Sequence, residues 1–450
     1  MAASLRIGSR SRRPLWLLLL AALGLTATGC HGPSPKPGVV LIILDTVRAD
    51  HLGAYGYSRA TSPNLDRLAA EGDRFDEAWS QAPWTLPAIA TVLTGLPPHL
   101  HGAGRGTLGL NPLRGDVQTL AERLAAAGFR TAAVANVVFF RPELGLGRGF
   151  QHFDYVANTS NADARDARAT TDAALAWLPS VGEEPFFLLV HYFDAHLTYD
   201  PPPPYDTLFE PDGEGRIGRG FGDAKQVAEL AKGTLQLSER QKQSLVARYD
   251  GEIRFVDEQF ARLRAGLEAQ GLWQRSLVIV VADHGEEFWD HGSFEHGHTH
   301  YRELLRVPLI VRRPGIAGGK VQTSRVRQLD IAPTVLQFAG LRAPSELPGR
   351  PLDGDGARYS VAEGTFWAGD LASVRSDAGT YIFDRTTREW KVFAGDDRLE
   401  HHDLWQGGGA PSGEWAELLE ALPPTLVARA GEWTPSPSQR EQLRSLGYVR

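Results

Sequence analysis

Cysteine is almost absent from this chain, which has one, Cys30, among its 450 residues. A single cysteine excludes a disulfide framework, a Cys-x-x-Cys redox site and a cysteine-ligated zinc knuckle, and its position in the leader gives no support to a cysteine protease. The chemistry of the protein therefore has to use oxygen and nitrogen ligands.

The chain also lacks an excess of positive charge. It has 47 Lys and Arg against 54 Asp and Glu, a net charge of -7, and no extended basic block. A nucleic-acid backbone needs such a basic surface, so we expect no nucleic acid among the ligands. The hydrophobic content of 42% and the 11 tryptophans are enough for a large core, which excludes a disordered or fibrous chain.

Several catalytic motifs are missing as well. The sequence has no Gly-x-Ser-x-Gly elbow, no Walker A sequence and no His-Glu-x-x-His pair. A serine hydrolase, a nucleotide kinase and a zincin would each require one of these motifs. Residues 104–109 do spell Gly-x-Gly-x-x-Gly, but they follow a Pro/His turn and precede Asn111-Pro112, so no helix N-terminus is available for a pyrophosphate. No period of 20 to 50 residues repeats, which excludes solenoids and propellers.

The N-terminus predicts an exported protein. Four arginines precede an apolar run over residues 15–25, which is short for a bilayer span and ends in Ala27-Thr28-Gly29-Cys30. Small residues before a cysteine resemble the lipobox of bacterial lipoproteins, in which that cysteine is acylated. We therefore expect a signal peptide at residues 1–30 and a periplasmic or cell-envelope location, with a lipidated Cys30 as membrane anchor; plain cleavage or an uncleaved anchor are the alternatives. The Pro-rich residues 31–37 are expected to form a linker.

Runs of aliphatic and β-branched residues predict strands buried on both faces. They lie at residues 39–44, 131–135, 186–190, 277–281 and 307–311. Helices are expected between them, at residues 62–71, 116–127, 165–178 and 238–270. This alternation predicts an α/β fold, with a mainly parallel sheet and helices on both faces.

Two regions fall outside this regular pattern. Residues 201–234 are rich in Pro and Gly and are expected to form a loop or lid. After about residue 350, short strands near 372–375, 380–385 and 389–394 and a helix near 413–422 predict a small α+β subdomain. The expected domains are therefore 38–350, carrying the catalytic site, and 351–450.

Acidic residues and histidines follow several of the predicted strands. Asp45 ends the first, His191, Asp194 and His196 follow the third, and residues 283–286, Asp-His-Gly-Glu, follow the fourth. Because ligands of parallel sheets bind beyond the carboxyl ends of the strands, these side chains are expected to converge on one edge. Two Asp and a His suit a divalent cation such as zinc or manganese better than calcium. A lone Asp45 could equally cap the next helix.

The segments around these residues resemble the sulfatase family of the alkaline phosphatase superfamily. The opening, Val39 to His51 followed by Gly53-Ala54-Tyr55-Gly56, is similar to bacterial members, and so are residues 191–196, 282–288 and 295–310. Residues 84–95 resemble the nucleophile segment, in which the reactive residue stands ten positions before the glycine of a Thr-Gly pair. Counting back from Gly95 gives Thr85. The resemblance covers nearly the whole chain after the leader and implies an alkaline phosphatase-like fold.

The chain departs from the family at the nucleophile itself. Sulfatases use a formylglycine made from Cys or Ser, whereas this chain has Thr85, with Ala88 and Ile89 where the motif's Ser and Arg would stand. We therefore expect no formylglycine. Phosphoethanolamine and phosphoglycerol transferases of the same superfamily use an unmodified threonine, and Thr85 is similar to theirs.

The resemblance implies a role for each site residue. Asp45, Asp283 and His284 would hold one divalent cation, with Zn or Mn favoured and Ca possible, and Thr85 would complete the coordination and attack the substrate. His196 and His298 would bind the transferred group or protonate the leaving oxygen. Without the family pattern, Thr85 would be interpreted as a helix cap, and the histidines between 291 and 300 as a polar loop. Arg48 could neutralise charge near Asp45 or pair with Asp50.

The sequence thus predicts a metal-dependent hydrolase of sulfate or phosphate esters. Its partner would be a sulfated or phosphorylated small molecule, glycan or lipid headgroup. One alternative is a phosphoethanolamine- or phosphoglycerol-type transferase that acts on envelope components. The other is a non-catalytic lipoprotein that binds metal and glycans. The oligomeric state does not follow from the sequence.

Overall fold

The computed structural model describes residues 1, 4, 36–157, 165–210, 215–367, 369–427, 429 and 431–445. The chain divides into two compact units, Met1–Pro35 and Lys36–Arg450. The predicted signal peptide with Cys30 and the linker as far as residue 35 lie outside the described residues, apart from residues 1 and 4. None of the helices in the described ranges is long and apolar enough to cross a membrane.

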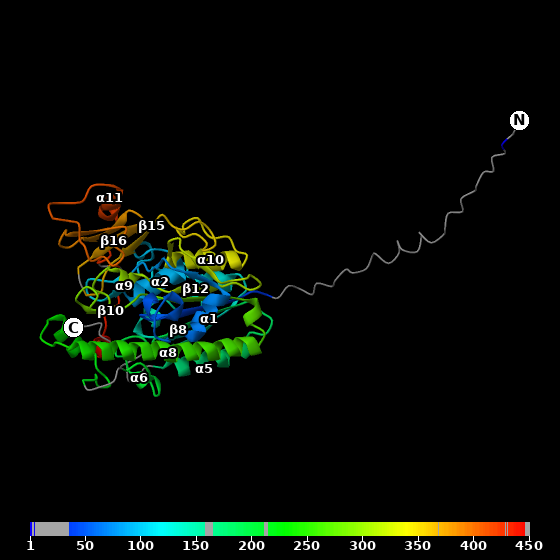
Figure 1. Ribbon diagram of the computed structural model, residues 1–450, viewed down its shortest axis with the longest axis horizontal. Coiled ribbons are helices and arrows are strands. Elements are labelled where there is room, and N and C mark those ends of the chain that lie inside the picture. Colours follow the sequence, from blue (N-terminus) through cyan, green and yellow to red (C-terminus); the bar gives the residue numbers. More distant parts are fainter. Residues whose placement is uncertain are drawn as a thin grey trace. The chain divides into compact units, whose positions relative to one another are not determined.

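The second unit is built around an eight-stranded sheet of order β13-β2-β12-β9-β1-β8-β6-β7 (Figure 1). Its strands are β1 (Gly38–Leu44), β2 (Asp73–Phe75), β6 (Arg130–Asn136), β7 (His152–Val156), β8 (Phe186–Tyr192), β9 (Ser276–Ala282), β12 (Leu309–Arg312) and β13 (Lys320–Gln322). β1 runs parallel to β8 and β9, whereas β12 is antiparallel to both β9 and β2. The prediction of a mainly parallel α/β sheet is confirmed.

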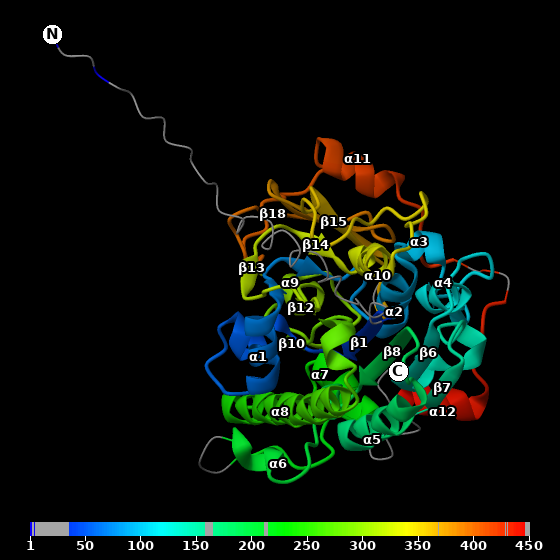
Figure 2. The same cartoon turned by 90° about the vertical axis from the view of Figure 1, so that its right-hand side faces the viewer.

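The sheet carries helices on both faces (Figure 2). On one side lie α1 (Pro63–Glu71), α5 (Ala167–Trp177) and the 31-residue α8 (Glu239–Ala269). On the other lie α2 (Thr85–Thr94), α4 (Leu120–Ala126) and α10 (Ile331–Phe338). Because both faces are covered, every residue of β1 is buried, as its unbroken aliphatic run predicts.

Sheet register brings the strand ends to one level. Leu44, the last residue of β1, pairs with Tyr192 of β8 and with Ala282 of β9. The next residue after each of the strands β1 and β9 is an aspartate, Asp45 or Asp283. Three parallel strands in this register therefore place both carboxylates at the same edge of the sheet.

Some elements differ from the sequence prediction. α4 begins at Leu120 rather than 116, because Thr119 and Glu122 form a capping box that fixes its first turn. The predicted loop or lid at 201–234 contains two short helices, α6 (Tyr205–Leu208) and α7 (Ala224–Ala231).

The C-terminal part forms a separate antiparallel sheet of order β15-β16-β17-β18. β16 (Leu371–Ser376), β17 (Gly379–Asp384), β18 (Trp390–Ala394) and the helix α11 (Glu414–Ala421) match the predicted elements. β15 (Tyr359–Glu363) and α12 (Pro437–Ser445) were not predicted. Trp415 and Leu419 of α11 pack on this sheet in a small core of their own.

Acid should destabilise the fold through His101, which is fully buried at the end of α3 (Pro98–His101). Its Nδ1 accepts the N–H of Ala103, and burial lowers the pKa of His101 from 6.5 to about 3. The folded chain then binds fewer protons than the unfolded chain between these values. The free energy of unfolding should therefore fall as the pH drops below about 6.5, by about 1.4 kcal/mol per unit for this group. Urea unfolding at pH 7 and pH 5 measures this slope.

In a His101→Gln variant the free energy of unfolding should depend less steeply on pH than in the wild type. His402→Gln, at a side chain that is 84% exposed, serves as the matched control and should keep the wild-type slope. Equal slopes in all three proteins would contradict the assignment to His101.

Candidate metal and nucleophile site

Asp45, Asp283 and His284 come together at the carboxyl edge of the sheet. One ligand atom from each lies within 4.8 Å of the others, and all three side chains are fully buried. They follow β1 and β9 directly, so the register of the central strands positions them. A glycine is required next, because a Cβ at Gly285 would lie 1.9 Å from the backbone oxygen of Glu303 in α9 (Arg302–Leu305).

Three buried carboxylate oxygens in this group lack a hydrogen-bond partner among the described residues: both of Asp45 and Oδ2 of Asp283. Oδ1 of Asp283, by contrast, accepts the backbone N–H groups of Thr46 and His284 at 3.1 and 2.8 Å. Burial, reinforced by the charge of Asp283, raises the pKa of Asp45 well above its usual range. Unpaired buried oxygens are costly, and a cation between them would remove that cost.

The imidazole of His284 is oriented for the same centre. Its Nδ1 donates to the carbonyl oxygen of Gly285 at 2.9 Å, which leaves the lone pair on Nε2. Nε2 lies 3.3 Å from Oδ2 of Asp283 and 4.0 Å from Oδ1 of Asp45. Two carboxylates and an imidazole form a donor set that fits a divalent cation.

Thr85 points into this group from the other side. It is the first residue of α2 and is fully buried, and Trp84 occupies the N-cap position before it. Its hydroxyl Oγ1 lies 3.2 Å from Nε2 of His284. A hydroxyl at the end of a helix thus contacts the candidate metal ligands, and the cap position belongs to its neighbour.

A row of histidine rings continues from His284. The ring of His296 lies 4.5 Å from that of His284 and 4.9 Å from that of His196, measured between centroids. Phe193 stacks on His196 at 4.5 Å, and His196 Nδ1 donates to the carbonyl of Leu197 at 2.7 Å. Burial and the neighbouring imidazoles lower the pKa of both His196 and His296 well below the usual value.

Glu286 orients His296. Its Oε1 lies 3.0 Å from Nδ1 of His296, and its Oε2 accepts the hydroxyl of Tyr199 at 2.8 Å. Burial raises the pKa of Glu286 to about 8.

His298 lies beside the group, with Nε2 2.9 Å from Oε2 of Glu287. His298 is the residue predicted from this histidine-rich segment, whereas the ring that contacts His284 is that of His296. His191 was predicted to lie at this edge but without a role in the site, and its Nε2 lies 3.2 Å from Oδ2 of Asp45. The repeated His in residues 295–300 was the available signal, but spacing alone does not say which ring turns inward.

Other polar residues of this region have structural partners. Arg48 pairs with Asp50 at 2.8 Å and also with Asp290 at 2.7 Å. His291 bonds to Glu303 at 2.8 Å, and His300 lies between Ser373 and the carbonyl of Gly364. Arg48 and two of the four clustered histidines, His291 and His300, therefore have partners outside the candidate centre.

A cavity of about 90 Å³ reaches His196 and gives the site a neighbouring space. Its lining includes Arg165, Asp194 and Glu252. The guanidinium of Arg165 is held by Asp154 at 2.7 Å and by Asn136 Oδ1 at 2.8 Å. A fixed cation therefore lies beside the histidine row.

The mainly parallel sheet, with buried carboxylates, an imidazole and a hydroxyl at its carboxyl edge, defines an ester hydrolase of the alkaline phosphatase-like fold. The Sulfatase family model matches residues 37–341, and the chain belongs to the sulfatase family. It is a sulfatase-like hydrolase that acts on ester bonds.

Relatives and solved structures agree with this membership. The chain is 26% identical to N-acetylglucosamine-6-O-sulfatase of Bacteroides thetaiotaomicron, over 75% of this chain and 74% of that protein. It is 25% identical to an arylsulfatase of Clostridium perfringens, over 70% and 78% of the two chains. A phosphonate monoester hydrolase from Silicibacter pomeroyi has the same fold, with a TM-score of 0.66 and 23% identity over 80% of this chain and 90% of that one.

Proposed function

We propose that the protein hydrolyses a sulfate or phosphate ester with Thr85 as the nucleophile. One divalent cation, Zn or Mn by preference and Ca as a possibility, would be held by Asp45, Asp283 and His284, with Thr85 completing its coordination. The observation that carries the proposal is the hydroxyl of Thr85, buried 3.2 Å from Nε2 of His284 in a group where three of the four carboxylate oxygens have no hydrogen-bond partner among the described residues. Formylglycine is made from Cys or Ser, so the threonine at position 85 is not a precursor for it.

A bound cation would supply the positive charge that lowers the pKa of a nearby hydroxyl and that stabilises charge on the transferred group. Thr85 loses its hydroxyl proton to solvent, and Oγ1 attacks the sulfur or phosphorus atom. The bond from that atom to the bridging ester oxygen breaks, and the leaving oxygen takes a proton. Water then attacks the same sulfur or phosphorus atom, the bond from that atom to Oγ1 breaks, and Oγ1 takes up a proton as sulfate or phosphate is released.

His196 and His298 are the residues proposed to bind the transferred group or to protonate the leaving oxygen. His196 borders the cavity beside the site, so its ring meets a ligand that enters there. His296 joins this set, since its ring lies between those of His284 and His196. Arg165 adds a fixed cation next to the path of an anionic ester.

The substrate is proposed to be a sulfated or phosphorylated small molecule, glycan or lipid headgroup. The relative named as an N-acetylglucosamine-6-O-sulfatase supports a sulfate ester as substrate, and the shared fold of a phosphonate monoester hydrolase supports a phosphorus ester. The leader sequence supports a periplasmic or cell-envelope location with lipidated Cys30 as the anchor.

Metal analysis and a substrate panel test the proposal. The chain from residue 31 on, without the lipid anchor, is purified, and its divalent metal content is measured. It is then assayed on 4-nitrophenyl sulfate, 4-nitrophenyl phosphate and bis(4-nitrophenyl) phosphate. Metal-dependent turnover of at least one ester is the expected result, and the preferred ester decides between sulfur and phosphorus. Bound metal without turnover of any ester would instead favour the non-catalytic binding lipoprotein.

Glu286→Gln should lower kcat by about 10- to 100-fold, the range typical of residues that orient the groups of a metal site. One oxygen of Glu286 contacts His296 and the other accepts the hydroxyl of Tyr199, and the change replaces one of these two oxygens with an amide nitrogen. Steady-state kinetics on the best ester and the metal content of the same samples measure the effect.

Glu303→Gln is the matched control, because Glu303 likewise orients a histidine, His291, but away from the candidate centre. It should leave kcat unchanged. Equal losses in both variants would contradict a specific role for Glu286.

A further inference from the structure

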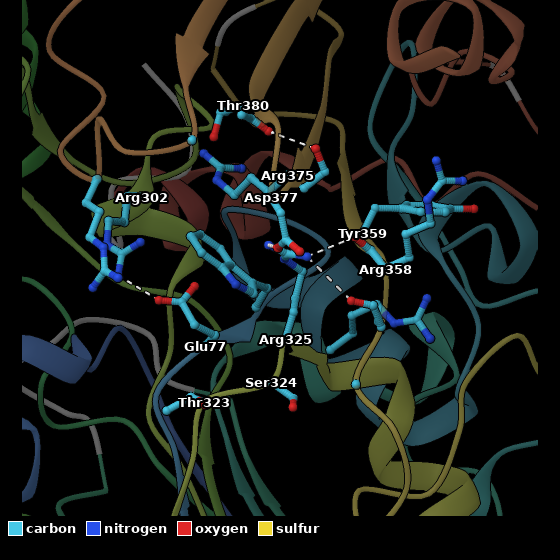
Figure 3. A pocket seen from close by; sticks show the side chains of 18 of the residues that line it. Glu77, Arg302, Thr323, Ser324, Arg325, Arg358, Tyr359, Arg375, Asp377 and Thr380 are labelled. Atoms are coloured by element: carbon cyan, nitrogen blue, oxygen red, sulfur yellow. Dashed lines mark hydrogen bonds and ion pairs between the residues drawn. The ribbon is translucent and has the colours of Figure 1, made fainter.

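A large cavity of about 920 Å³ lies between the C-terminal sheet and the segments that follow β2 and β13 (Figure 3). Its volume lies within the range of about 300 to 1,000 Å³ found for small-molecule sites. Its lining contains none of the residues proposed for the metal, the nucleophile or the histidine row. We call it the arginine pocket after the residues that line it.

Positive charge is concentrated there, although the protein as a whole carries a net charge of -7. Five carboxylates line the arginine pocket, and so do seven arginines: Arg302, Arg325, Arg327, Arg350, Arg358, Arg375 and Arg398. Figure 3 shows Arg302, Arg325, Arg358 and Arg375 around the hollow, with the hydroxyls of Ser324, Thr323 and Thr380 on its border.

The carboxylates of the lining are already engaged. Three of them pair with arginines of the pocket: Glu77 with Arg302 at 3.3 Å, Asp377 with Arg325 at 2.8 Å, and Glu400 with Arg375 at 3.0 Å. The remaining two are also engaged, Asp76 by Arg74 and Asp397 by the backbone N–H groups of His401 and His402.

Two guanidinium groups remain uncommitted. Arg327 and Arg358 pair with Asp330 and Glu414, which lie outside the lining. Within the part of the chain that the structure describes, the side chains of Arg350 and Arg398 form no hydrogen bond or ion pair, and both residues are exposed. The pocket therefore has charge available for a ligand from two different segments.

Unmatched donors point the same way. Nε1 of Trp79 and Nε of Arg325 are buried and have no acceptor among the described residues. The indole of Trp79 is 4% exposed and lies under the guanidinium groups of Arg302 and Arg375, at 5.3 and 4.9 Å. Donors left over around a positively charged hollow favour a ligand that is rich in acceptors.

We propose that the arginine pocket binds a multivalent oxyanion, a molecule with two or more sulfate or phosphate groups. A guanidinium presents paired N–H donors in a plane and matches the oxygens of such groups in pairs. The volume far exceeds one sulfate ion, and the uncommitted Arg350 and Arg398 come from different segments, so a ligand with several anionic groups uses both. This binding needs neither Thr85 nor a divalent cation.

Isothermal titration calorimetry at low ionic strength tests the proposal. The probes are a heparin tetrasaccharide for sulfate groups, tripolyphosphate for phosphate groups and neutral chitotetraose. Each is titrated into metal-loaded and metal-stripped protein. At least one of the two anionic probes should bind in both states, more weakly as salt is added, and the better probe identifies the source of the oxyanion. Chitotetraose should not bind to the pocket.

The double variant Arg350→Ser/Arg398→Ser should bind the anionic probe at least about tenfold more weakly, since charge-assisted hydrogen bonds contribute factors of this size or more. Arg67→Ser/Arg130→Ser removes the same charge at two exposed positions, in α1 and β6, and should bind like the wild type. The enzyme's ester turnover provides a folding check for both.

Four results would overturn the proposal: no binding of either anionic probe, equally weak binding by the two double variants, equal binding of chitotetraose, or loss of binding on metal removal. The last would locate the anion at the catalytic centre and leave the proposed hydrolase function intact. Failure of ester turnover, in turn, does not affect the calorimetric result.

Discussion

Thr85→Ala should lower kcat on the best ester by about 10³- to 10⁶-fold, the range seen when a catalytic nucleophile is removed. The variant loses the oxygen that would form the covalent bond, while Asp45, Asp283 and His284 keep their positions. Metal content and KM should therefore stay close to the wild-type values. Steady-state kinetics with metal analysis of the same preparation separates these quantities.

Thr85→Ser is the conservative partner of this change. It keeps a hydroxyl at the first position of α2 and loses only a methyl group, so it should retain most of the activity. Mass spectrometry of the wild type, quenched during turnover, should find the transferred group on the peptide that contains Thr85. If Thr85→Ala turns over ester at the wild-type rate, water or another residue is the nucleophile.

Asp45→Asn should weaken the binding of the divalent cation by more than the roughly 10- to 100-fold typical of changes outside the metal's own ligands. Both oxygens of Asp45 are buried without a hydrogen-bond partner among the described residues, so a bound cation would compensate their negative charge. The amide removes that charge. Metal titration followed by elemental analysis measures the loss, and ester turnover should fall with it.

The same variant should have the opposite effect on the metal-free fold. Without a cation, Asp45 and Asp283 are two buried acids whose mutual repulsion adds to the cost of burial. Asn at position 45 relieves this, so the metal-free variant should unfold at the same temperature as the metal-free wild type or a higher one. Adding metal should raise the midpoint of the wild type much more than that of the variant.

Asp50→Asn is the control for removing one acid near β1. Asp50 pairs with Arg48 near the protein surface. The variant should bind metal like the wild type. Equal metal affinity in Asp45→Asn and wild type would contradict the proposed ligand role of Asp45.

The central sheet could be predicted because its signals are local. β1 is an unbroken aliphatic run, and such a run alone is enough to predict a strand buried on both faces. β15 was missed because the buried positions of Tyr359–Glu363 carry Ser360, Ala362 and Glu363 instead of large apolar residues, so its assignment depends on its partner β16. Short strands such as β2 and β13 have three residues each and leave no periodic pattern.

The candidate site divides in the same way. Asp45, Asp283 and His284 follow strands that the sequence reveals, so their convergence could be predicted from parallel register. The choice between His296 and His298 could not, because both lie on an irregular segment, and the direction of each ring depends on the carboxylate it meets, Glu286 or Glu287. The arginine pocket had no sequence signal either, since its seven arginines are spread from Arg302 to Arg398.

The order of strands in the sheet has a consequence for biosynthesis. Among the described strands β1 is the first to leave the ribosome, yet its two neighbours are β8 and β9, whose last residues are Tyr192 and Ala282. Until those segments emerge, Gly38–Leu44 is an apolar strand with both edges open, a template for pairing with other chains. Such non-local pairing folds slowly. The middle strand of the sheet therefore cannot pair on both edges until residue 282 has been synthesised.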